Sequence, residues 1–532
     1  MSEYKKLQNG SDIRGIAIDG IDGEKPNLTP KEANHIAAGF AKWLREKTGR
    51  EDVTIAVGRD PRVSGPDLLE GLLQGFCKEG IQVFDAGLAS TPAMFMATIF
   101  ENVRAGGACE GSIMITASHL PFNRNGFKFF TKDGGLDKKD IARILELAEE
   151  DAAKGAGECD PRPAQVTDLA LMDAYCVHLQ QVIRTGVTDG STGAPDVAAA
   201  KKAAERPLAG MKIVVDAGNG SGGFFAEKVL APLGADISGS QFLEPDGMFP
   251  NHAPNPENRE AMESISSQVI KTGADLGLIF DTDVDRSSAV DEQGREIARN
   301  SIVAMAAALV SEDHPGTTVV TDSITSRQLT EFLENKLGLN HLRYKRGYKN
   351  VINKAIELNR AGTDCQLAIE TSGHAALQEN YFLDDGAYLA AKIVIRVARL
   401  KQEGKPISSV LADLEDPADE KEVRIPIRTE DFGAYGCLLY TSEVQDRGRK
   451  RRGSAAGRRR GTLCQGTWRH DLLLQRPGSY SQGSEGRMAV YRRYGHAGRG
   501  RIHFPGRQKE RRYRQRWRKY LSGTDRKLPQ RL

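Results

Sequence analysis

Short apolar runs alternate with longer helix-like segments over the first 430 or so residues of the chain. The runs are continuously apolar, as strands are when both faces of a sheet are covered. Strands are expected at Val53–Val57, Ile81–Phe84, Ile113–Ile115, Lys212–Val215, Leu276–Phe280, Thr318–Val320 and Leu367–Ile369, and helices at Glu32–Lys47, Asp67–Glu79, Lys138–Lys154, Arg259–Thr272 and Ser301–Ser311.

This alternation predicts an α/β fold in which sheets are flanked by helices. Shifts in composition mark the expected boundaries: a Gly/Ser/Thr-rich and then Ala/Lys-rich stretch at 186–208, the turn at 314–316, and the segment after Ile427. We therefore expect domains at 1–190, 209–313 and 314–428.

The chain changes character after about Gly436. Residues 437–532 contain 26 Lys and Arg against 6 Asp and Glu, so a body of about −17 and a tail of about +20 underlie the overall charge of +3. The basic runs lack helical or strand periodicity, which favours a disordered or irregular tail. A basic arm for nucleic acid is a second interpretation. A reading-frame shift in GC-rich DNA is a third, and it is compatible with disorder.

Other features narrow the functional class. No stretch reaches the roughly 20 apolar residues of a membrane span, and the N-terminus has neither a signal-peptide core nor a transit-peptide composition. The seven cysteines are odd in number and have no C-x-x-C spacing, which predicts reduced thiols and no zinc site. We expect a cytoplasmic protein that is not bound to a membrane, or a plastid one if a transit peptide is missing from this chain.

Ser118 and His119 follow the run Ile113–Ile115 and enter a turn-forming segment that contains Pro121 and Gly126. A hydroxyl on a loop at the end of a strand is suited to act as a nucleophile or phosphate carrier. The hydrolase motif G-x-S-x-G does not fit here. If Ser118 carried a phosphate, with a charge of roughly −2, Mg²⁺, Lys128 and Arg14 could neutralise it.

Asp281, Asp283 and Asp285 alternate after the run Leu276–Phe280. Alternate residues of an extended backbone project to one side, and three carboxylates there repel one another unless a cation lies between them. Oxygen ligands favour a hard ion, Mg²⁺ first. An EF-hand loop fits poorly because Arg286 stands where that loop needs glycine. A solvated acidic turn remains the alternative.

A third polar cluster, Glu370, Ser372 and His374, follows the run Leu367–Ile369. Glutamate and serine beside a glycine suit a pair of sugar hydroxyls, although a turn with a satisfied glutamate has the same composition. The segment 345–349 adds cations that suit a substrate phosphate, although such runs are usually solvated.

Taken together, these clusters resemble three signatures of the α-D-phosphohexomutase superfamily. Order and spacing agree over residues ~8–430, and the segments Gly58–Gly65 and Pro250–Glu257 are similar to further family segments. The matching motifs are Thr116-Ala-Ser118-His119-x-Pro121, Asp281-x-Asp283-x-Asp285-Arg286 and Glu370-x-Ser372-Gly373-His374.

The resemblance implies three related α/β domains around a deep cleft, carrying in turn a phosphoserine, a metal loop and a sugar loop, and then a fourth domain. It implies that Ser118 is phosphorylated and binds Mg²⁺ with the three aspartates. The residues with implied roles are Arg14, Lys128 and Arg286 as electrostatic helpers, Glu370 and Ser372 on sugar hydroxyls, and His374, Lys349 and His119 beside the substrate.

The implied activity is the interconversion of hexose 1-phosphate and hexose 6-phosphate through a hexose 1,6-bisphosphate intermediate. Glucose and mannose phosphates are favoured, and glucosamine phosphate is an alternative. The chain would act as a monomer or dimer.

One family feature has no counterpart in this sequence, an Arg-x-Ser-x-Thr loop of the fourth domain that grips the non-transferred phosphate. The nearest fragment, Tyr520–Asp525, lacks the arginine, and the basic tail lies where this domain should be. A catalytically impaired mutase that binds sugar phosphate or a partner is therefore a second hypothesis. Non-specific nucleic-acid binding by the tail is a third.

Overall fold

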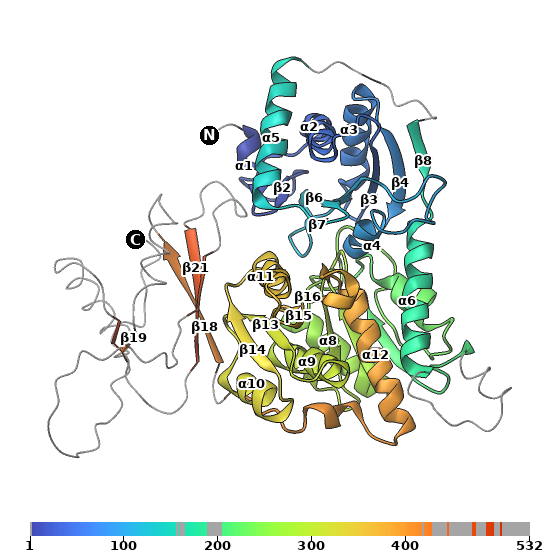
Figure 1. The fold of residues 1–532 in the computed structure, drawn as a ribbon, viewed down its shortest axis with the longest axis vertical. Helices are drawn as coiled ribbons and strands as arrows, with labels where there is room; N and C mark the ends of the chain where they lie inside the picture. Colours follow the sequence, from blue (N-terminus) through green and yellow to red (C-terminus); the bar gives the residue numbers. More distant parts are fainter. Residues whose placement is uncertain are drawn as a thin grey trace. The chain divides into compact units, whose positions relative to one another are not determined.

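The computed structural model describes residues 3–155, 159, 165–188 and 205–417, and five short strands beyond them. The chain divides into two compact units, one of Met1–Asp416 with Gly478–Gly483 and one of Pro417–Pro477 with Ser484–Leu532. The first unit contains three mixed sheets with helices packed against them (Figure 1). The prediction of three successive α/β domains is confirmed.

Domain I has the strand order β1-β2-β6-β5-β3-β4-β8, with β7 paired to β6. Its elements are α1 (Glu3–Lys6), β1 (Gln8–Asn9), β2 (Asp12–Ile16), α2 (Pro30–Thr48), β3 (Thr54–Arg59), α3 (Gly65–Lys78), β4 (Gln82–Leu88), α4 (Thr91–Met96), β5 (Gly111–Ile115), β6 (Arg124–Thr131), β7 (Gly134–Gly135), α5 (Lys138–Ala153), β8 (Val166–Asp168) and α6 (Leu171–Thr188). Strands β5, β3, β4 and β8 are parallel, whereas β6 and β2 run antiparallel to their neighbours.

Alternate side chains of β5 show why its apolar run is unbroken. Ile113 and Ile115 pack in one cluster with α2, α3 and α5, whereas Met114 packs in another with α4 and α6. Successive strand residues point to opposite faces of a sheet. A strand between two helical layers therefore needs apolar residues at every position.

Local signals at the ends of α2 explain where it begins and ends. Thr29 and Glu32 form a reciprocal capping box, and Pro30 occupies the first helical position, where its missing N–H is not needed. The helix ends at Gly49, whose φ of 69° is left-handed. The expected helix Glu32–Lys47 is thus extended by two residues at the start and by one at the end.

Domain II has a four-stranded sheet with the order β12-β11-β10-β9, and domain III a five-stranded sheet with the order β14-β13-β15-β16-β17. Their elements are β9 (Ile213–Asp216), η2 (Phe225–Leu230), α8 (Arg259–Thr272), β10 (Leu276–Phe280), β11 (Ser287–Val290), β12 (Glu296–Ile297), α9 (Asn300–Asp313), β13 (Thr318–Asp322), α10 (Arg327–Glu331), η3 (Phe332–Lys336), β14 (Asn340–Tyr344), α11 (Tyr348–Arg360), β15 (Cys365–Ile369), β16 (Ala375–Leu377), η4 (Gln378–Asn380), β17 (Leu383–Asp384), α12 (Gly386–Gln402) and η5 (Ile407–Leu411).

The three domains share one supersecondary unit. In each, a buried parallel strand leads into a polar loop and then into an antiparallel neighbour: β5 and β6 in domain I, β10 and β11 in domain II, β15 and β16 in domain III. The three polar clusters expected from the sequence lie on these three loops.

Helices α6 and α12 fasten the domains to one another. The Tyr175 hydroxyl of α6 donates to Asp385 at the start of α12, at 2.7 Å, and Arg399 of α12 donates to the Gly186 carbonyl at 2.8 Å. One apolar cluster includes Phe95 of domain I, Phe280 of domain II and Ile369 of domain III. This packing fixes the positions of the three loops relative to one another.

One prediction about the cysteines is wrong. Cys77, near the end of α3, and Cys159, in the connection after α5, form a disulfide with their Cα atoms 6.0 Å apart. They are separated by 82 positions, so no local spacing of cysteines in the sequence predicts the disulfide. Cys109, Cys176 and Cys365 are buried free thiols, as expected.

The second unit is described only as strands: β18 (Glu420–Ile427), β20 (Asp471–Leu474) and β21 (Gly486–Arg493) form one sheet, and β19 (Val444–Gln445) pairs with β22 (Arg501–Ile502). Apart from these strands, the predictions for residues 437–532, including those on a fourth domain, lie outside the described residues. Among the helices that the structure describes, none combines the length and the apolar character needed to cross a membrane.

Candidate active site

The loops of the three domains meet around Ser118. The Ser118 hydroxyl, on the domain I loop, donates to Asp281 Oδ2 of the domain II loop at 3.0 Å. It also accepts a hydrogen bond from Arg286 Nη2 at 3.3 Å. Arg286 also forms an antiparallel backbone bridge with His374 of the domain III loop. Residues that are more than 250 positions apart therefore line one site.

Ser118 has a constrained backbone as well as a buried side chain. Its φ is 51°, in the left-handed region that non-glycine residues rarely adopt, and it is 3% exposed. Its N–H donates to Thr116 Oγ1 at 2.8 Å, and its hydroxyl lies 3.3 Å from His119 Nδ1. Such strain is concentrated at functional sites, where surrounding contacts maintain it.

Asp281, Asp283 and Asp285 form a buried carboxylate cluster with oxygens within 4.8 Å of one another. Burial, and next the charge of Asp285, raise the pKa of Asp281 well above its usual value. Asp283 Oδ1 and Asp285 Oδ1 are buried and have no hydrogen-bond partner among the described residues. Such oxygens are costly unless something pairs with them. The cluster therefore fits a hard divalent cation, with Ser118 at its edge.

Two cations from different domains hold this cluster. Lys128, on β6, donates to Asp285 and lies 3.7 Å from Asp283, and Arg286 Nη2 is 2.9 Å from Asp281 Oδ2. Burial opposes protonation of Lys128, but the charges of Asp285 and Asp283 raise its pKa well above the usual value. Burial likewise works against ionisation of Asp285, and the Lys128 ammonium outweighs it, so the pKa of Asp285 is lowered.

Arg14, on β2, acts on the serine loop through the backbone. Its guanidinium donates to the Ala117 carbonyl at 2.6 Å and to Asp12 Oδ2 at 2.9 Å. Burial opposes its charge, but Asp12 raises its pKa overall. The structure thus places Arg14 next to the serine loop, and its implied role as an electrostatic helper stays a prediction.

The domain III loop supplies two buried groups with spare hydrogen-bonding capacity. Glu370 Oε1 accepts from the Gly347 N–H at 2.5 Å, and burial raises the pKa of this carboxyl. Ser372 is 5% exposed, and its hydroxyl has no hydrogen-bond partner among the described residues. Between them and the metal loop, Gly373 has a φ of 92°, and a Cβ at this position would lie 2.6 Å from the Ser287 carbonyl oxygen.

His374 belongs to a dyad that sequence reasoning missed. Its Nδ1 lies 2.6 Å from Asp384 Oδ2 and 3.8 Å from Asp285 Oδ1. Burial lowers its pKa, but Asp384 and then Asp285 outweigh that effect and raise the pKa to about 9. His374 is therefore an imidazolium at neutral pH. Asp384 lies in a two-residue strand, β17, which is too short to give a periodic signal.

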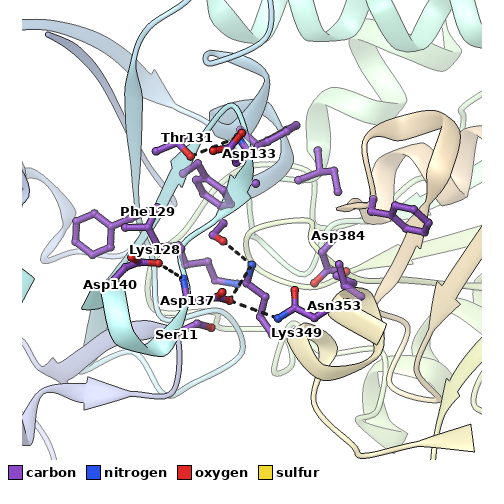
Figure 2. A pocket seen from close by; sticks show the side chains of 18 of the residues that line it. Ser11, Lys128, Phe129, Thr131, Asp133, Asp137, Asp140, Lys349, Asn353 and Asp384 are labelled. Carbon is purple, nitrogen blue, oxygen red and sulfur yellow. Dashed lines mark hydrogen bonds and ion pairs between the residues drawn. The ribbon is translucent and has the colours of Figure 1, made fainter. Parts of the chain in front are cut away.

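A cavity of about 480 Å³ borders the carboxylate cluster. Lys128, Asp384 and Lys349 lie along it, as Figure 2 shows. Lys349 Nζ donates to the Gly135 carbonyl at 2.5 Å, and burial lowers its pKa. Lys349 therefore faces this cavity from the α11 side, whereas Ser118 is not among the cavity's lining residues.

Two further contacts around the site were missed. Thr91, the first residue of α4, donates its hydroxyl to Asp283 Oδ2 at 2.5 Å. The Tyr348 ring stacks on His374 with centroids 5.1 Å apart, and its hydroxyl lies 3.2 Å from Ser11 Oγ. Both act across domain boundaries, where the linear sequence has no marker.

The EF-hand alternative is excluded by the geometry. A strand, β10, precedes Asp281 where an EF-hand has a helix. Glu292, which would be the twelfth ligand, instead accepts a hydrogen bond from Ser408 Oγ at 2.6 Å.

Three family descriptions match the body of the chain. Residues 5–154, 193–294 and 298–417 match, in order, the phosphoglucomutase/phosphomannomutase alpha/beta/alpha domains I, II and III. Together these matches account for most of the first unit.

Known proteins agree with these matches. A phosphomannomutase/phosphoglucomutase of Pseudomonas syringae is 31% identical over 389 residues, which is 72% of each chain. A phosphoglucomutase of Neisseria meningitidis is 32% identical over 384 residues, 72% of this chain and 74% of the relative. A solved family protein from Burkholderia thailandensis shares the fold, with a TM-score of 0.67 at 22% identity over 99% of both chains. The chain belongs to the phosphoglucomutase/phosphomannomutase family.

Proposed function

We propose that this protein is a phosphohexomutase, which interconverts hexose 1-phosphate and hexose 6-phosphate through a phosphoserine at Ser118. The observation that carries this proposal is the position of the Ser118 hydroxyl, bonded to Asp281 and Arg286 at the edge of a buried carboxylate cluster. The names of the relatives support glucose and mannose phosphates as substrates.

The proposed reaction balances in two transfers. The Oγ–P bond of phosphoserine 118 breaks as a P–O bond forms to the free hydroxyl of the hexose monophosphate, and the proton of that hydroxyl ends on Ser118 Oγ. The resulting hexose 1,6-bisphosphate reorients and returns its other phosphoryl group to Ser118 Oγ, whose proton ends on the sugar oxygen that loses the phosphoryl group. Phosphoryl transfer of this kind depends on alignment and charge neutralisation more than on covalent chemistry.

Asp281, Asp283, Asp285 and phosphoserine 118 would hold Mg²⁺, which when bound supplies charge neutralisation to the phosphoryl oxygens. Arg286, which donates to the Ser118 hydroxyl, and Lys128, which is paired with Asp285, contribute fixed positive charge to the site. His374, paired with Asp384, adds another positive charge to the site. Glu370 and Ser372 would accept and donate to sugar hydroxyls.

Mass spectrometry of the intact protein tests the proposal. After incubation with glucose 1,6-bisphosphate and Mg²⁺, the wild-type protein should gain about 80 Da, the mass of one phosphoryl group on serine. The Ser118→Ala variant should lack this adduct and lose at least ~1,000-fold in turnover, as removal of a covalent catalyst does.

The matched control is Ser372→Ala, which removes a hydroxyl from the sugar loop and should retain the adduct. An adduct that persists in Ser118→Ala, or its absence from the wild-type protein, would count against the assignment.

A further inference from the structure

Arg62 is a fully buried arginine next to the serine loop, and its side chain is 0% exposed. Its Nη1 donates to the carbonyls of Pro121 at 2.7 Å and Arg124 at 3.0 Å. Its Nη2 donates to the carbonyl of Leu120 at 2.7 Å and to that of Ser118. Its Nε donates to Asp60 Oδ2 at 3.1 Å. One guanidinium therefore binds four carbonyls of the segment that contains Ser118.

Only an arginine side chain fits these partners. The guanidinium carries five N–H groups in a rigid planar fork, whereas a lysine ammonium has three donors around one atom. The loop carbonyls of residues 118–124 converge on this fork, because the segment turns around it. Without the fork, several buried carbonyls would lose their partner, and each such loss is costly.

Asp60 connects the same fork to the other side of Ser118. Its Oδ2 accepts from Thr116 Oγ1 at 2.7 Å, and Thr116 Oγ1 accepts from the Ser118 N–H at 2.8 Å. The carbonyl and the N–H of Ser118 are thus both tied to the Asp60–Arg62 pair. This explains how a non-glycine residue keeps a φ of 51° at this position.

Residues of domain II cover the guanidinium of Arg62. The Phe249 ring lies with its centroid 5.2 Å from Arg62 Cζ. Beside it, a Cβ on Gly247 would come within 2.4 Å of the Pro61 carbonyl oxygen and 2.8 Å of Arg62 Cα. The two loops approach each other so closely that only glycine fits.

We propose that Arg62 is a positioning residue for phosphoryl transfer. It holds the Ser118 backbone so that the hydroxyl faces Asp281, and Phe249 of domain II keeps the guanidinium in place. We call Asp60, Arg62, Thr116 and Phe249 the Arg62 clamp. The inference rests on the proposed function for its effect on turnover, and it goes beyond that function because Arg62 acts through the backbone and donates to no side chain of the catalytic or metal-binding residues in the structure. Its loss should lower kcat and leave KM nearly unchanged.

Hydrogen exchange and kinetics on the full-length chain test the clamp in the Arg62→Lys and Phe249→Leu variants. Amides of the loop 116–124 should exchange roughly 10-fold faster in Arg62→Lys, because local opening becomes easier. The kcat of this variant should fall about 100-fold, the cost of displacing a reacting group by about 1 Å. Its KM should stay within about 3-fold. Phe249→Leu, a change in domain II, should raise exchange of the domain I loop about 3-fold.

Arg104→Ala is the matched control. Arg104 also lies over an aromatic ring, with Cζ 4.6 Å from the Phe84 centroid, and it also donates to a loop carbonyl, that of Ala108 at 2.9 Å. It belongs to domain I and not to the serine loop. This variant should leave exchange of residues 116–124 and kcat unchanged.

Guanidinium rescue adds a readout that a purely structural role would not move. Guanidinium chloride at millimolar concentration should restore part of the kcat of Arg62→Ala and none of the kcat of Ser118→Ala. The clamp is overturned if loop exchange in Arg62→Lys equals that of the wild type, or if exchange rises while kcat stays constant. An inactive wild type would overturn the proposed function instead, and the exchange data would still decide whether Arg62 holds the loop.

Discussion

The site loops of domain I and domain III begin in the same way and are completed differently. Each follows a buried parallel strand, β5 or β15, and leads to an antiparallel one. In domain I the N–H, carbonyl and hydroxyl of Ser118 all have protein partners. In domain III the buried Ser372 hydroxyl has none among the described residues.

The difference separates two tasks. A buried polar group without a partner costs on the order of 1–3 kcal/mol, so such a group in a site loop is suited to pair with something outside the protein. In the domain I loop, other parts of the protein supply every hydrogen-bond partner of Ser118, so the loop can hold a reacting atom in place. In the domain III loop, a bound ligand would supply the partner of the Ser372 hydroxyl.

The largest effect should follow removal of a hydroxyl that supports the Ser118 backbone in domain I. Thr116→Val keeps the shape of the side chain but leaves the Ser118 N–H without its acceptor. We expect a loss of about 2–3 kcal/mol in unfolding free energy and about a 100-fold loss in turnover. Urea unfolding and steady-state kinetics measure the two effects.

Thr98→Val provides the control for this substitution. Thr98 is also buried in domain I, but its hydroxyl donates to the Phe95 carbonyl, away from the site. It should lose about 1 kcal/mol and no activity. Equal kinetic losses in the two variants would show that the serine loop is not special.

Glu370→Gln tests the carboxylate of the domain III loop. The amide oxygen still accepts from the Gly347 N–H, but the carboxylate that would accept from sugar hydroxyls is lost. We expect kcat/KM to fall about 100-fold, mainly through KM, because charged acceptors make the stronger hydrogen bonds. The phosphoserine should remain. Glu379→Gln, which removes the ion pair with Lys392 away from the sugar loop, should change neither value.

Acid should weaken domain III through a buried histidine. His341 lies 2.8 Å from Thr321 Oγ1 and 2.9 Å from Thr330 Oγ1, and burial, then Arg343, lower its pKa to about 3. The unfolded chain has the usual pKa of about 6.5, so it takes up a proton that the folded chain excludes. Stability is complete above pH ~6.5 and declines as the pH falls toward 3.

Calorimetry at pH 7 and pH 5 measures this effect. We expect the His341→Gln variant to lack a loss of about 2 kcal/mol that the wild type shows at pH 5. The same acid loss in both proteins would place its cause elsewhere.

The smallest effect should come from Ser372→Ala. Because the buried hydroxyl has no partner among the described residues, its removal should raise the unfolding free energy by about 1 kcal/mol. Substrate binding should still weaken about 10-fold, the value of one neutral hydrogen bond. A large destabilisation would mean that the domain III loop is as complete as that of domain I.

The sequence predicted the strands that lead into the site more readily than the strands that leave it. Continuous apolar runs mark β5, β10 and β15, and the polar clusters that follow them meet as expected. The returning strand β6 was not anticipated, because it carries Arg124 and Lys128, which are buried by pairing with Glu24 and Asp285. A strand whose charged residues are buried in ion pairs therefore does not look buried in the sequence.

The contacts of Arg62 illustrate what a sequence does not show. Four of its five acceptors are backbone carbonyls, which are present in every residue and have no letter of their own. The Cys77–Cys159 pair and the His374–Asp384 dyad were missed for a different reason, because they depend on tertiary proximity between side chains. Motifs indicate reacting groups, whereas the groups that hold them in place become visible only with the fold.

The close fit of Gly373 against the Ser287 carbonyl has a consequence for protein engineering. The five positions from Glu370 to His374 form a cassette between β15 and β16. Gly373 and His374 must be kept, because Gly373 allows the backbone contact and the His374 side chain forms the dyad with Asp384. Positions 370 to 372 are free of that constraint. Selectivity for the sugar could therefore be varied there, as in a library, while the phosphoryl chemistry of domain I remains as it is.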